Sequence, residues 1–242
     1  FNDLLIKLEA NDTASEFVRQ KIRDIVKDPV TAENLAPKTY PIGTKRICID
    51  SGYFETFNRK NVELVNISEQ PIERITSNGL IANNTQYEFD SIIFATGFDA
   101  MTGSLFNVDI KGRNNKSLRE KWYAGPRSYL GLMTESFPNL FMITGPGSPS
   151  VKSNMIISIE QHVDFIVDSM SHMEEHGLGV IEPDIEFENK WVDHVQEVAN
   201  KTLFPRANSW YMGANIPGKP RLFTPYIGGV GRYRKICEEV VA

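Results

Sequence analysis

The segment of residues 91–99, with the sequence SIIFATGFD, constrains the fold of this chain more than any other segment. A run of β-type apolar residues ends on Ala95, Thr96 and Gly97 and then becomes polar. Small residues at a strand end let a large group approach the backbone, and ligands of open α/β sheets bind beyond the carboxyl ends of the strands. The segment therefore indicates either a nucleotide cofactor site or a tightly packed strand end.

Length and charge restrict the class of protein. The 242 residues, 41% of them hydrophobic, suffice for one large domain or for parts of two, and a chain that begins at Phe1 is expected to be a piece of something longer. No apolar run approaches the roughly 18 residues of a membrane span, and no signal peptide is visible. A net charge of −5 disfavours a nucleic-acid partner. Cys48 and Cys237, far apart and without a CxxC motif, predict reduced thiols and a cytoplasmic location.

Apolar periodicity predicts both helices and strands. Residues 1–36 are expected to be helical, with a capping-box pattern at 13–16, and a loop rich in Pro and Gly follows over 36–46. Further helices are predicted at 53–57, 153–176, 186–201 and 232–241. Strands are predicted at 47–49, 62–67, 72–76, 80–82, 87–95 and 140–143, with a hairpin turn at Asn78-Gly79.

The strand predicted at 140–143 leads into the turn GPGSPS at residues 145–150 and then into the longest predicted helix. In a strand, glycine-rich turn and helix arrangement, the N–H groups of the first helical turn, here near Asn154 and Met155, can bind an anion or an electron-rich carbonyl. The same residues also fit a plain reversal of the chain.

Lys45 and Arg46 are candidate ligand-binding cations, because they lie in a loop bordered by Pro and Gly just before a predicted strand. A guanidinium stays protonated at every working pH and can hold an anionic intermediate, whereas a compact ammonium suits a phosphate. The alternative for both residues is a solvated surface pair. Trp210, beside a Gly-rich segment, is either a ligand contact or a core residue.

The sequence HMEEH, from His172 to His176, matches an inverted zinc-protease pattern. It lies at the C-terminal end of a predicted helix, where His and polar residues are expected as dipole partners, and no third ligand is apparent. No metal site is therefore predicted.

Five sequence blocks together resemble Baeyer–Villiger monooxygenases, in the order in which that family carries them. They are YPIGTKR at 40–46, FNRKNVELV at 57–65, ATGFDAMTG at 95–103, GPGSPSVKSNM at 145–155 with SIEQHV at 158–163, and SWYMGANIPGKPR at 209–221. Both glycine-rich dinucleotide fingerprints and the FxGxxxHxxxWP signature of the family are missing from this sequence. The resemblance is therefore to the C-terminal half of such an enzyme.

The resemblance implies an α/β fold with two Rossmann-like dinucleotide-binding domains, one for FAD and one for NADP, and a helical insertion. Residues 1–36 would end the insertion, 37–95 would complete the NADP-binding domain, and 96–242 would complete the FAD-binding domain. The partner of this chain would be the N-terminal half of the same enzyme, and the chain alone is expected to be inactive.

The implied activity is insertion of one oxygen of O2 beside a ketone carbonyl, giving an ester or lactone, with NADPH and a C4a-peroxyflavin. Two alternatives stay open. One is an isolated, non-catalytic fragment that lacks the FAD fingerprint, and the other is a flavin monooxygenase that oxygenates nitrogen or sulfur.

The resemblance also implies roles for individual residues. Arg46 matches the active-site arginine of the family, and Lys45 matches its lysine for the NADP 2′-phosphate. Met155 matches the residue whose backbone meets the pyrimidine edge of the flavin, and Trp210 matches a tryptophan that contacts NADP. Thr96 and Gly97 would lie at the cofactor where the chain crosses between the domains. The segment that would line the substrate pocket consists of Ser150, Val151, Lys152 and Ser153.

Overall fold

The computed structural model describes residues 2–149 and 153–241. The helices and strands are, in chain order, α1 (Leu8–Ile25), α2 (Pro29–Leu35), α3 (Tyr53–Thr56), β1 (Ile72–Thr76), β2 (Gly79–Ala82), β3 (Thr85–Glu88), α4 (Gly103–Phe106), η1 (Arg113–Asn115), α5 (Leu118–Lys121), α6 (Met155–Glu175), α7 (Ile185–Asn200), η2 (Phe204–Arg206), η3 (Trp210–Met212) and α8 (Val230–Val241). None of the helices in these two ranges has the length and apolar character needed to cross a membrane.

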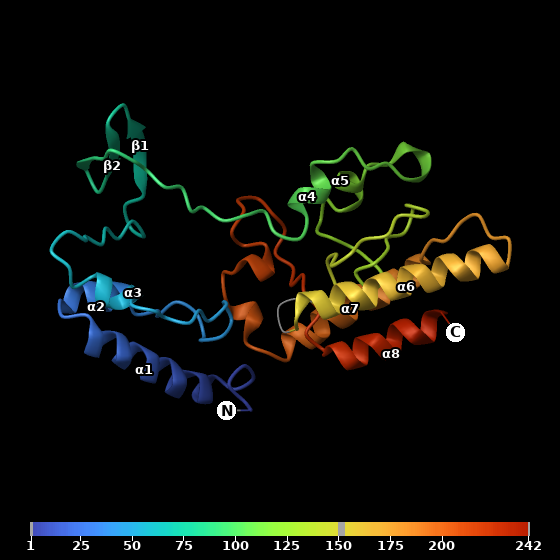
Figure 1. Ribbon diagram of the computed structural model, residues 1–242, viewed down its shortest axis with the longest axis horizontal. Coiled ribbons are helices and arrows are strands. Elements are labelled where there is room, and N and C mark those ends of the chain that lie inside the picture. Colours follow the sequence, from blue (N-terminus) through green and yellow to red (C-terminus); the bar gives the residue numbers. More distant parts are fainter. Residues whose placement is uncertain (1, 150–152, 242) are drawn as a thin grey trace.

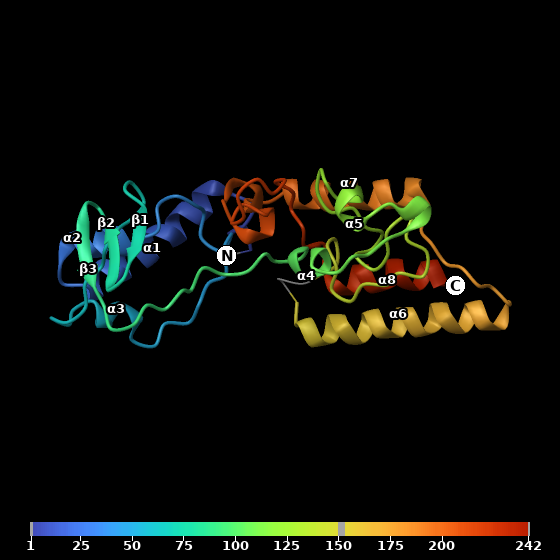
Figure 2. The ribbon, with the colours of Figure 1, turned by 90° about the horizontal axis from the view of Figure 1, so that it is seen from above.

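The molecule is elongated and has two lobes (Figures 1 and 2). The N-terminal lobe, residues 2–88, holds α1, α2, α3 and the small sheet, and the C-terminal lobe, residues 103–241, holds the other helices. A crossover segment, residues 89–102, runs as an extended trace from the sheet to α4. A loop of residues 37–52 reaches from α2 to the middle of the molecule and returns to α3.

The helices of the N-terminal lobe form largely where the periodicity predicts them. The capping box at 13–16 is wrong, because α1 begins at Leu8 and Thr13 lies inside it, where its hydroxyl donates to the Glu9 carbonyl at 3.1 Å. A threonine can be satisfied in this way within a helix as well as at its start. Asp28 caps α2 by accepting from the Thr31 N–H at 2.7 Å, and Pro29 occupies the first turn.

The sheet contains three strands in the order β1-β2-β3, and both pairings are antiparallel. The hairpin predicted at Asn78-Gly79 is confirmed, since Thr76 pairs with Gly79. Gly79 has no room for a side chain, because a Cβ there would lie 1.8 Å from the Tyr87 carbonyl oxygen. Asn83 and Asn84 both have positive φ, which matches the twist that a tight hairpin between β2 and β3 requires.

Four predicted strand segments form no ladder in the described ranges: 47–49, 62–67, 89–95 and 140–143. The strand predicted at 87–95 ends at Glu88. Two apolar residues on these segments, Ile49 and Ile93, are 96% and 91% exposed. A strand exists only when a neighbour accepts and donates its backbone hydrogen bonds, and no segment in the described ranges forms a ladder with these four. The apolar pattern is present, and the pairing partner is not among the described residues.

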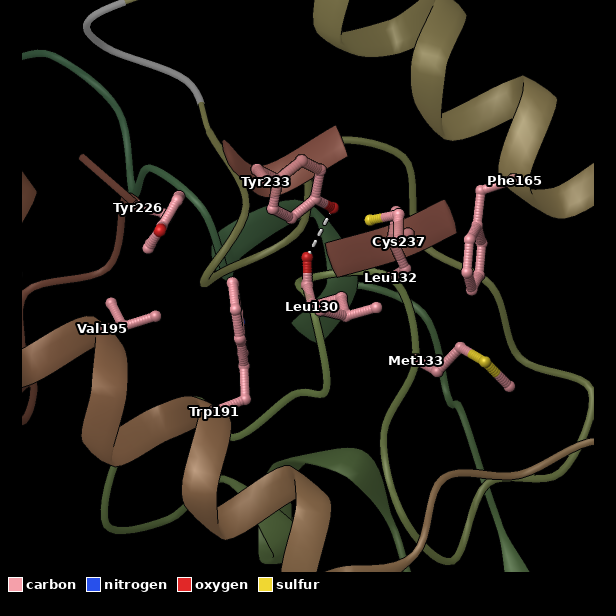
Figure 3. Packing of buried hydrophobic residues seen from close by; sticks show 9 residues of the cluster. All are labelled: Leu130, Leu132, Met133, Phe165, Trp191, Val195, Tyr226, Tyr233 and Cys237. Atoms are coloured by element: carbon pink, nitrogen blue, oxygen red, sulfur yellow. Dashed lines mark hydrogen bonds between the residues drawn. The ribbon is translucent and has the colours of Figure 1, made fainter. Parts of the chain in front are cut away.

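The core of the C-terminal lobe joins α6, α7 and α8 to the segment of residues 129–133 (Figure 3). Its largest members are aromatic, and Trp191 contributes ring contacts at 5.0 Å to Tyr226 and 5.9 Å to Tyr233. The Tyr233 hydroxyl donates to the Leu130 carbonyl at 2.7 Å, so this buried phenol is satisfied. Burial of these rings holds three helices together in a lobe whose described residues contain no sheet.

A buried ion cluster fixes α7 to α5. Glu188 is fully buried, and its Oε1 lies 2.9 Å from the Lys121 Nζ, which also contacts Glu135 at 2.6 Å. The Oε2 of Glu188 accepts from the Glu135 backbone N–H at 2.7 Å and from the Thr134 hydroxyl at 3.0 Å. Each buried charge therefore has an opposite charge or a donor beside it, as burial demands.

His162 is fully buried in α6 and is held as the neutral imidazole. Its Nδ1 accepts from the Thr144 N–H at 3.0 Å, and its Nε2 lies 3.3 Å from the Tyr233 hydroxyl. Since that hydroxyl gives its proton to Leu130, the Nε2 of His162 carries the hydrogen that donates to it. Burial lowers the pKa of His162 to about 4.

Acidification should therefore destabilise the C-terminal lobe. An unfolded histidine has a pKa of about 6.5, whereas His162 in the folded lobe has a pKa of about 4. Between these two pH values the unfolded chain binds a proton that the folded lobe does not. The stabilisation is complete above about pH 6.5 and is lost as the pH falls toward 4, by about 3 kcal/mol in total. We expect this loss in urea unfolding of the full-length protein, followed by hydrogen exchange of the α6 amides, at about pH 8 and about pH 5.

The matched variants are His162→Asn, which keeps an acceptor for Thr144 but does not titrate, and His172→Gln at an exposed histidine. His162→Asn should flatten the pH dependence, and His172→Gln should leave it unchanged. An unchanged slope in His162→Asn would show that other groups cause it.

Candidate functional site

Three segments that are far apart in the sequence meet at a cavity of about 540 Å³. They are the loop of residues 37–52, the crossover segment and the loop of residues 208–219, named here the Trp210 loop. The lining residues are Lys45, Ala95, Thr96, Gly97, Phe98, Ala100, Asn208, Ser209, Trp210 and Asn215. Four residues singled out from the sequence, Lys45, Thr96, Gly97 and Trp210, thus lie around one space.

Gly97 leaves one side of this cavity open. Its φ is +82°, a conformation that favours glycine, and a Cβ built on it would meet no atom within 4 Å. Thr96 beside it is exposed. The backbone at this point is therefore accessible to a ligand.

The glycines of the turn at 145–150 have a different role, because protein atoms fill the space around them. A Cβ at Gly145 would lie 2.5 Å from the Gly131 carbonyl oxygen, and one at Gly147 would lie 3.2 Å from the Trp191 Nε1. The Trp191 indole also donates to the Gly147 carbonyl at 3.1 Å. These two glycines serve close packing of the chain reversal against the core.

Trp210 stands at the surface because its neighbours fill the core. Tyr211 and Met212 are buried, and Tyr211 packs against Phe204 and Phe223, whereas Trp210 is 36% exposed. The short helix η3 therefore presents the indole to the cavity and anchors itself through the next two side chains. Trp210 is therefore not a core residue.

Lys45 is half-buried and carries its charge over an aromatic ring. Its Nζ lies 4.4 Å from the centre of the Tyr40 ring, a cation–π contact. Within the described ranges no carboxylate lies within ion-pair distance of it. The ammonium is thus oriented but not neutralised.

Arg46 lines a second cavity of about 290 Å³, to which Lys45 also contributes. This cavity is mainly apolar, with Ile47, Tyr53 and Phe54 in its wall. Burial raises the pKa of the Tyr211 phenol, and the positive charge of Arg46 lowers it in the opposite direction. The Arg46 side chain is exposed.

Met155 begins α6, and Asn154 caps the helix by accepting from the Ile156 N–H at 2.9 Å. The N-terminal end of α6 faces the middle of the molecule (Figure 2). Met155 does not line either cavity described above. Of the predicted substrate segment, Ser153 lies 3.2 Å from the Ser158 hydroxyl, and Ser150, Val151 and Lys152 lie outside the described residues.

His172 and His176 stack at 4.1 Å, and a ring nitrogen of His176 lies 2.9 Å from the His172 carbonyl oxygen. Within residues 2–149 and 153–241, no three His, Cys, Asp or Glu side chains are grouped as metal ligands. Cys48 is exposed, Cys237 is buried, and both are free thiols.

Sequence analysis missed Ser209, Asn208 and Asn215, which complete the cavity wall. Ser209 is 4% exposed, and its hydroxyl has no hydrogen-bond partner among the residues that the structure describes. A buried hydroxyl without a hydrogen-bond partner is rare in native proteins, so this hydroxyl is a candidate for a hydrogen bond to a ligand. The only signal in the sequence was membership of the SWYMGANIPGKPR block.

Comparisons with known proteins agree with the predicted resemblance. No family model matches the chain. A Baeyer–Villiger monooxygenase of Pseudooceanicola batsensis is 42% identical over 241 residues, which are 99% of this chain and 44% of that protein. The phenazine N-monooxygenase PhzNO1 of Lysobacter antibioticus is 40% identical over 241 residues, 99% of this chain and 44% of that protein.

A solved structure of OTEMO in complex with FAD and NADP superimposes with a TM-score of 0.94 at 40% identity, covering 99% of this chain and 44% of that one. The resemblance to Baeyer–Villiger monooxygenases is thus confirmed along the chain, in sequence and in structure. The chain spans about 44% of the length of the curated relatives it matches.

Proposed function

We propose that this chain is the C-terminal part of a Baeyer–Villiger monooxygenase that uses FAD, NADPH and O2 to insert one oxygen beside a ketone carbonyl, giving an ester or lactone. The observation that carries the proposal is the meeting of Lys45, Gly97 and Trp210 around one cavity, with Arg46 beside it. The similarity to a Baeyer–Villiger monooxygenase over 99% of the chain supports the reaction class.

The residues of the cavity fit NADP. Its volume of about 540 Å³ falls within the range of ligand pockets. The Lys45 ammonium would pair with the 2′-phosphate, the Ser209 hydroxyl would gain the partner that it lacks, and the Trp210 indole would contact a planar ring. Open space at Gly97 would let the cofactor lie against the backbone. Bound NADPH would supply a hydride, and bound FAD would activate O2.

Arg46 would act on the substrate. Its guanidinium cannot lose its proton at working pH, so it would hold the negative charge that develops on oxygen during insertion. At Met155, the positive end of α6, a helix of 21 residues, would face the electron-rich edge of the flavin. Ser150, Val151, Lys152 and Ser153 would line the substrate pocket, and Thr96 would lie beside the cofactor with Gly97.

The proposed domain division is 1–36 for the end of a helical insertion, 37–95 for part of an NADP-binding domain and 96–242 for part of an FAD-binding domain, both Rossmann-like. Exposed apolar residues support a missing partner, which we take to be the N-terminal half of the same enzyme. Ile49 and Ile93 lie on segments without a pairing strand, and Phe98 is 86% exposed. On α6, Ile156 and Val167 are also exposed.

Product analysis of the full-length protein tests this proposal. With a panel of ketones, NADPH and O2, we expect esters or lactones and a flavin absorbance in the purified protein. The chain of 242 residues alone should oxidise no NADPH above background. The similarity to PhzNO1 makes N-oxygenation the second candidate, so aromatic nitrogen heterocycles belong in the panel. Formation of N-oxides without any ester would replace the first proposal by the second.

Lys45→Ala in the full-length enzyme should weaken NADPH far more than NADH, because only NADPH carries the 2′-phosphate. A hydrogen bond to a charged group contributes about 1.5–3 kcal/mol, so the KM for NADPH should rise about tenfold or more. Steady-state kinetics with both cofactors measure this. Lys45→Arg should retain much of the preference, and Lys60→Ala, at an exposed lysine, should not alter it. Equal losses for the two cofactors would contradict the role of Lys45.

A further inference from the structure

The Trp210 loop is attached to the crossover segment by three hydrogen bonds. The Lys219 Nζ donates to the Asp99 carboxylate and, at 2.9 Å, to the Ala100 carbonyl. The Asn215 amide donates to the Phe98 carbonyl at 2.8 Å. The Lys219 side chain is only 11% exposed, unlike the lysines of most ion pairs in the described ranges. The lysine end of this ion pair is therefore shielded from water, whereas the Asp99 side chain is 37% exposed.

Packing positions both partners of this ion pair. A Cβ at Gly103 would lie 2.7 Å from the Asp99 Cβ, so the glycine leaves the space that Asp99 needs. The stem of Lys219 lies on the turn that carries Trp210, because a Cβ at Gly213, directly after η3, would be 3.3 Å from the Lys219 Cγ and Cδ. Asp99 is thus fixed on the crossover segment and Lys219 on the Trp210 loop, two segments that both contribute residues to the lining of the cavity.

We propose that Lys219 and Asp99 are positioning residues that set the separation of Trp210 from the backbone at Gly97, and with it the affinity of the cavity for a nicotinamide dinucleotide. The cavity walls on either side of the ion pair come from the crossover segment and the Trp210 loop. Without the ion pair, the described residues would link the two segments through hydrogen bonds to the backbone carbonyls of Phe98 and, where Lys219 is kept, Ala100. The nature of the ligand rests on the proposed function, whereas the positioning rests on these contacts.

Kinetics of the full-length enzyme test the effect on binding. Lys219→Met and Asp99→Asn should each raise the KM for NADPH about tenfold and change kcat much less. The double exchange Asp99→Lys with Lys219→Asp should recover most of the loss, because it restores the ion pair. Gly103→Ala should reproduce the loss without removing a charge. Lys201→Met, which removes an exposed lysine paired with Glu197, is the control and should leave KM unchanged.

Hydrogen exchange supplies a readout that needs no cofactor. The N–H groups of Met212 and Ala214 bond to the Ser209 carbonyl, and that of Gly213 bonds to Trp210, so their exchange reports on the Trp210 loop. We expect faster exchange of these amides in Lys219→Met and Asp99→Asn than in the wild type or Lys201→Met, and slower exchange again in the double exchange variant.

Unchanged exchange in Lys219→Met would overturn the proposal, whatever the enzyme binds. Faster exchange with an unchanged KM for NADPH would overturn the link to affinity while leaving the proposed function intact. A wild-type protein that binds no NADP would refute the proposed function and with it the ligand, and the exchange data would still decide the positioning.

Discussion

Replacing Arg46 by alanine in the full-length enzyme is expected to lower the rate of ester formation by at least about 10²–10³-fold, the usual effect of removing one electrostatic stabiliser of a developing charge. Arg46 lines its cavity beside Lys45, and its positive charge acts to lower the pKa of the Tyr211 phenol, against the larger effect of burial. No carboxylate in the described ranges pairs with it, so its charge remains available to an anionic oxygen. Ester yield per unit time, with bound FAD followed by absorbance, measures the effect.

The controls separate catalysis from folding. Arg46→Lys should rescue little activity, because an ammonium lacks the planar donors of a guanidinium. Arg74→Ala removes an exposed arginine of β1 and should leave the rate unchanged. Retained FAD with a near-normal rate of ester formation in Arg46→Ala would make Arg46 a solvated surface residue and would refute its proposed role.

Lys121→Met should lower the free energy of unfolding of the C-terminal lobe by about 3–5 kcal/mol, because it removes the cation that lies 2.9 Å from the buried Glu188 Oε1 and leaves the more distant Arg127 Nε, at 4.0 Å. Glu188 is fully buried, and Lys121, with a side chain 6% exposed, bridges it to Glu135. Denaturant unfolding of the full-length protein, monitored through hydrogen exchange in α7, measures the loss.

A second substitution distinguishes an unpaired charge from a loss of packing. Adding Glu188→Gln to Lys121→Met removes the buried charge that has lost its nearer cation and should recover a large part of the stability. Lys201→Met breaks an exposed pair with Glu197 and should cost no more than about 1 kcal/mol. A double variant that is no more stable than Lys121→Met alone would contradict the electrostatic explanation.

Local sequence signals predict the parts of this fold that local interactions determine. The ends of α6 and α7 fall within two residues of the predicted helices, and the β1–β2 hairpin follows from Asn78-Gly79. The segments at 47–49 and 89–95 fail as strands because pairing depends on residues that are not beside them. Apolar alternation shows that a segment can form a strand, whereas the hydrogen-bonded ladder forms only when a neighbouring strand is present.

The candidate site could be predicted from the sequence only in part, because it too depends on contacts between residues far apart in the sequence. Lys45 and Trp210 were singled out from their loop surroundings and then from the family blocks, but nothing local to either residue shows that they line one cavity. Ser209 escaped notice because the signal that marks it, a buried hydroxyl without a partner, exists only in three dimensions. Gly145 and Gly147, which the turn motif singled out, prove to pack against protein.

The distance along the chain between the two walls of the cavity has a consequence for biosynthesis. Asp99 and Lys219 are 120 residues apart. A ribosome that has made the whole N-terminal lobe and the crossover segment has produced one wall, and the opposite wall cannot form until Lys219 has emerged. Contacts of such long range also pay the largest entropy of loop closure, so they form late in refolding. The two sides of this cavity therefore come together only after residues 208–219 have been made, and a nascent chain released before that point carries Lys45 and Gly97 without the Trp210 loop.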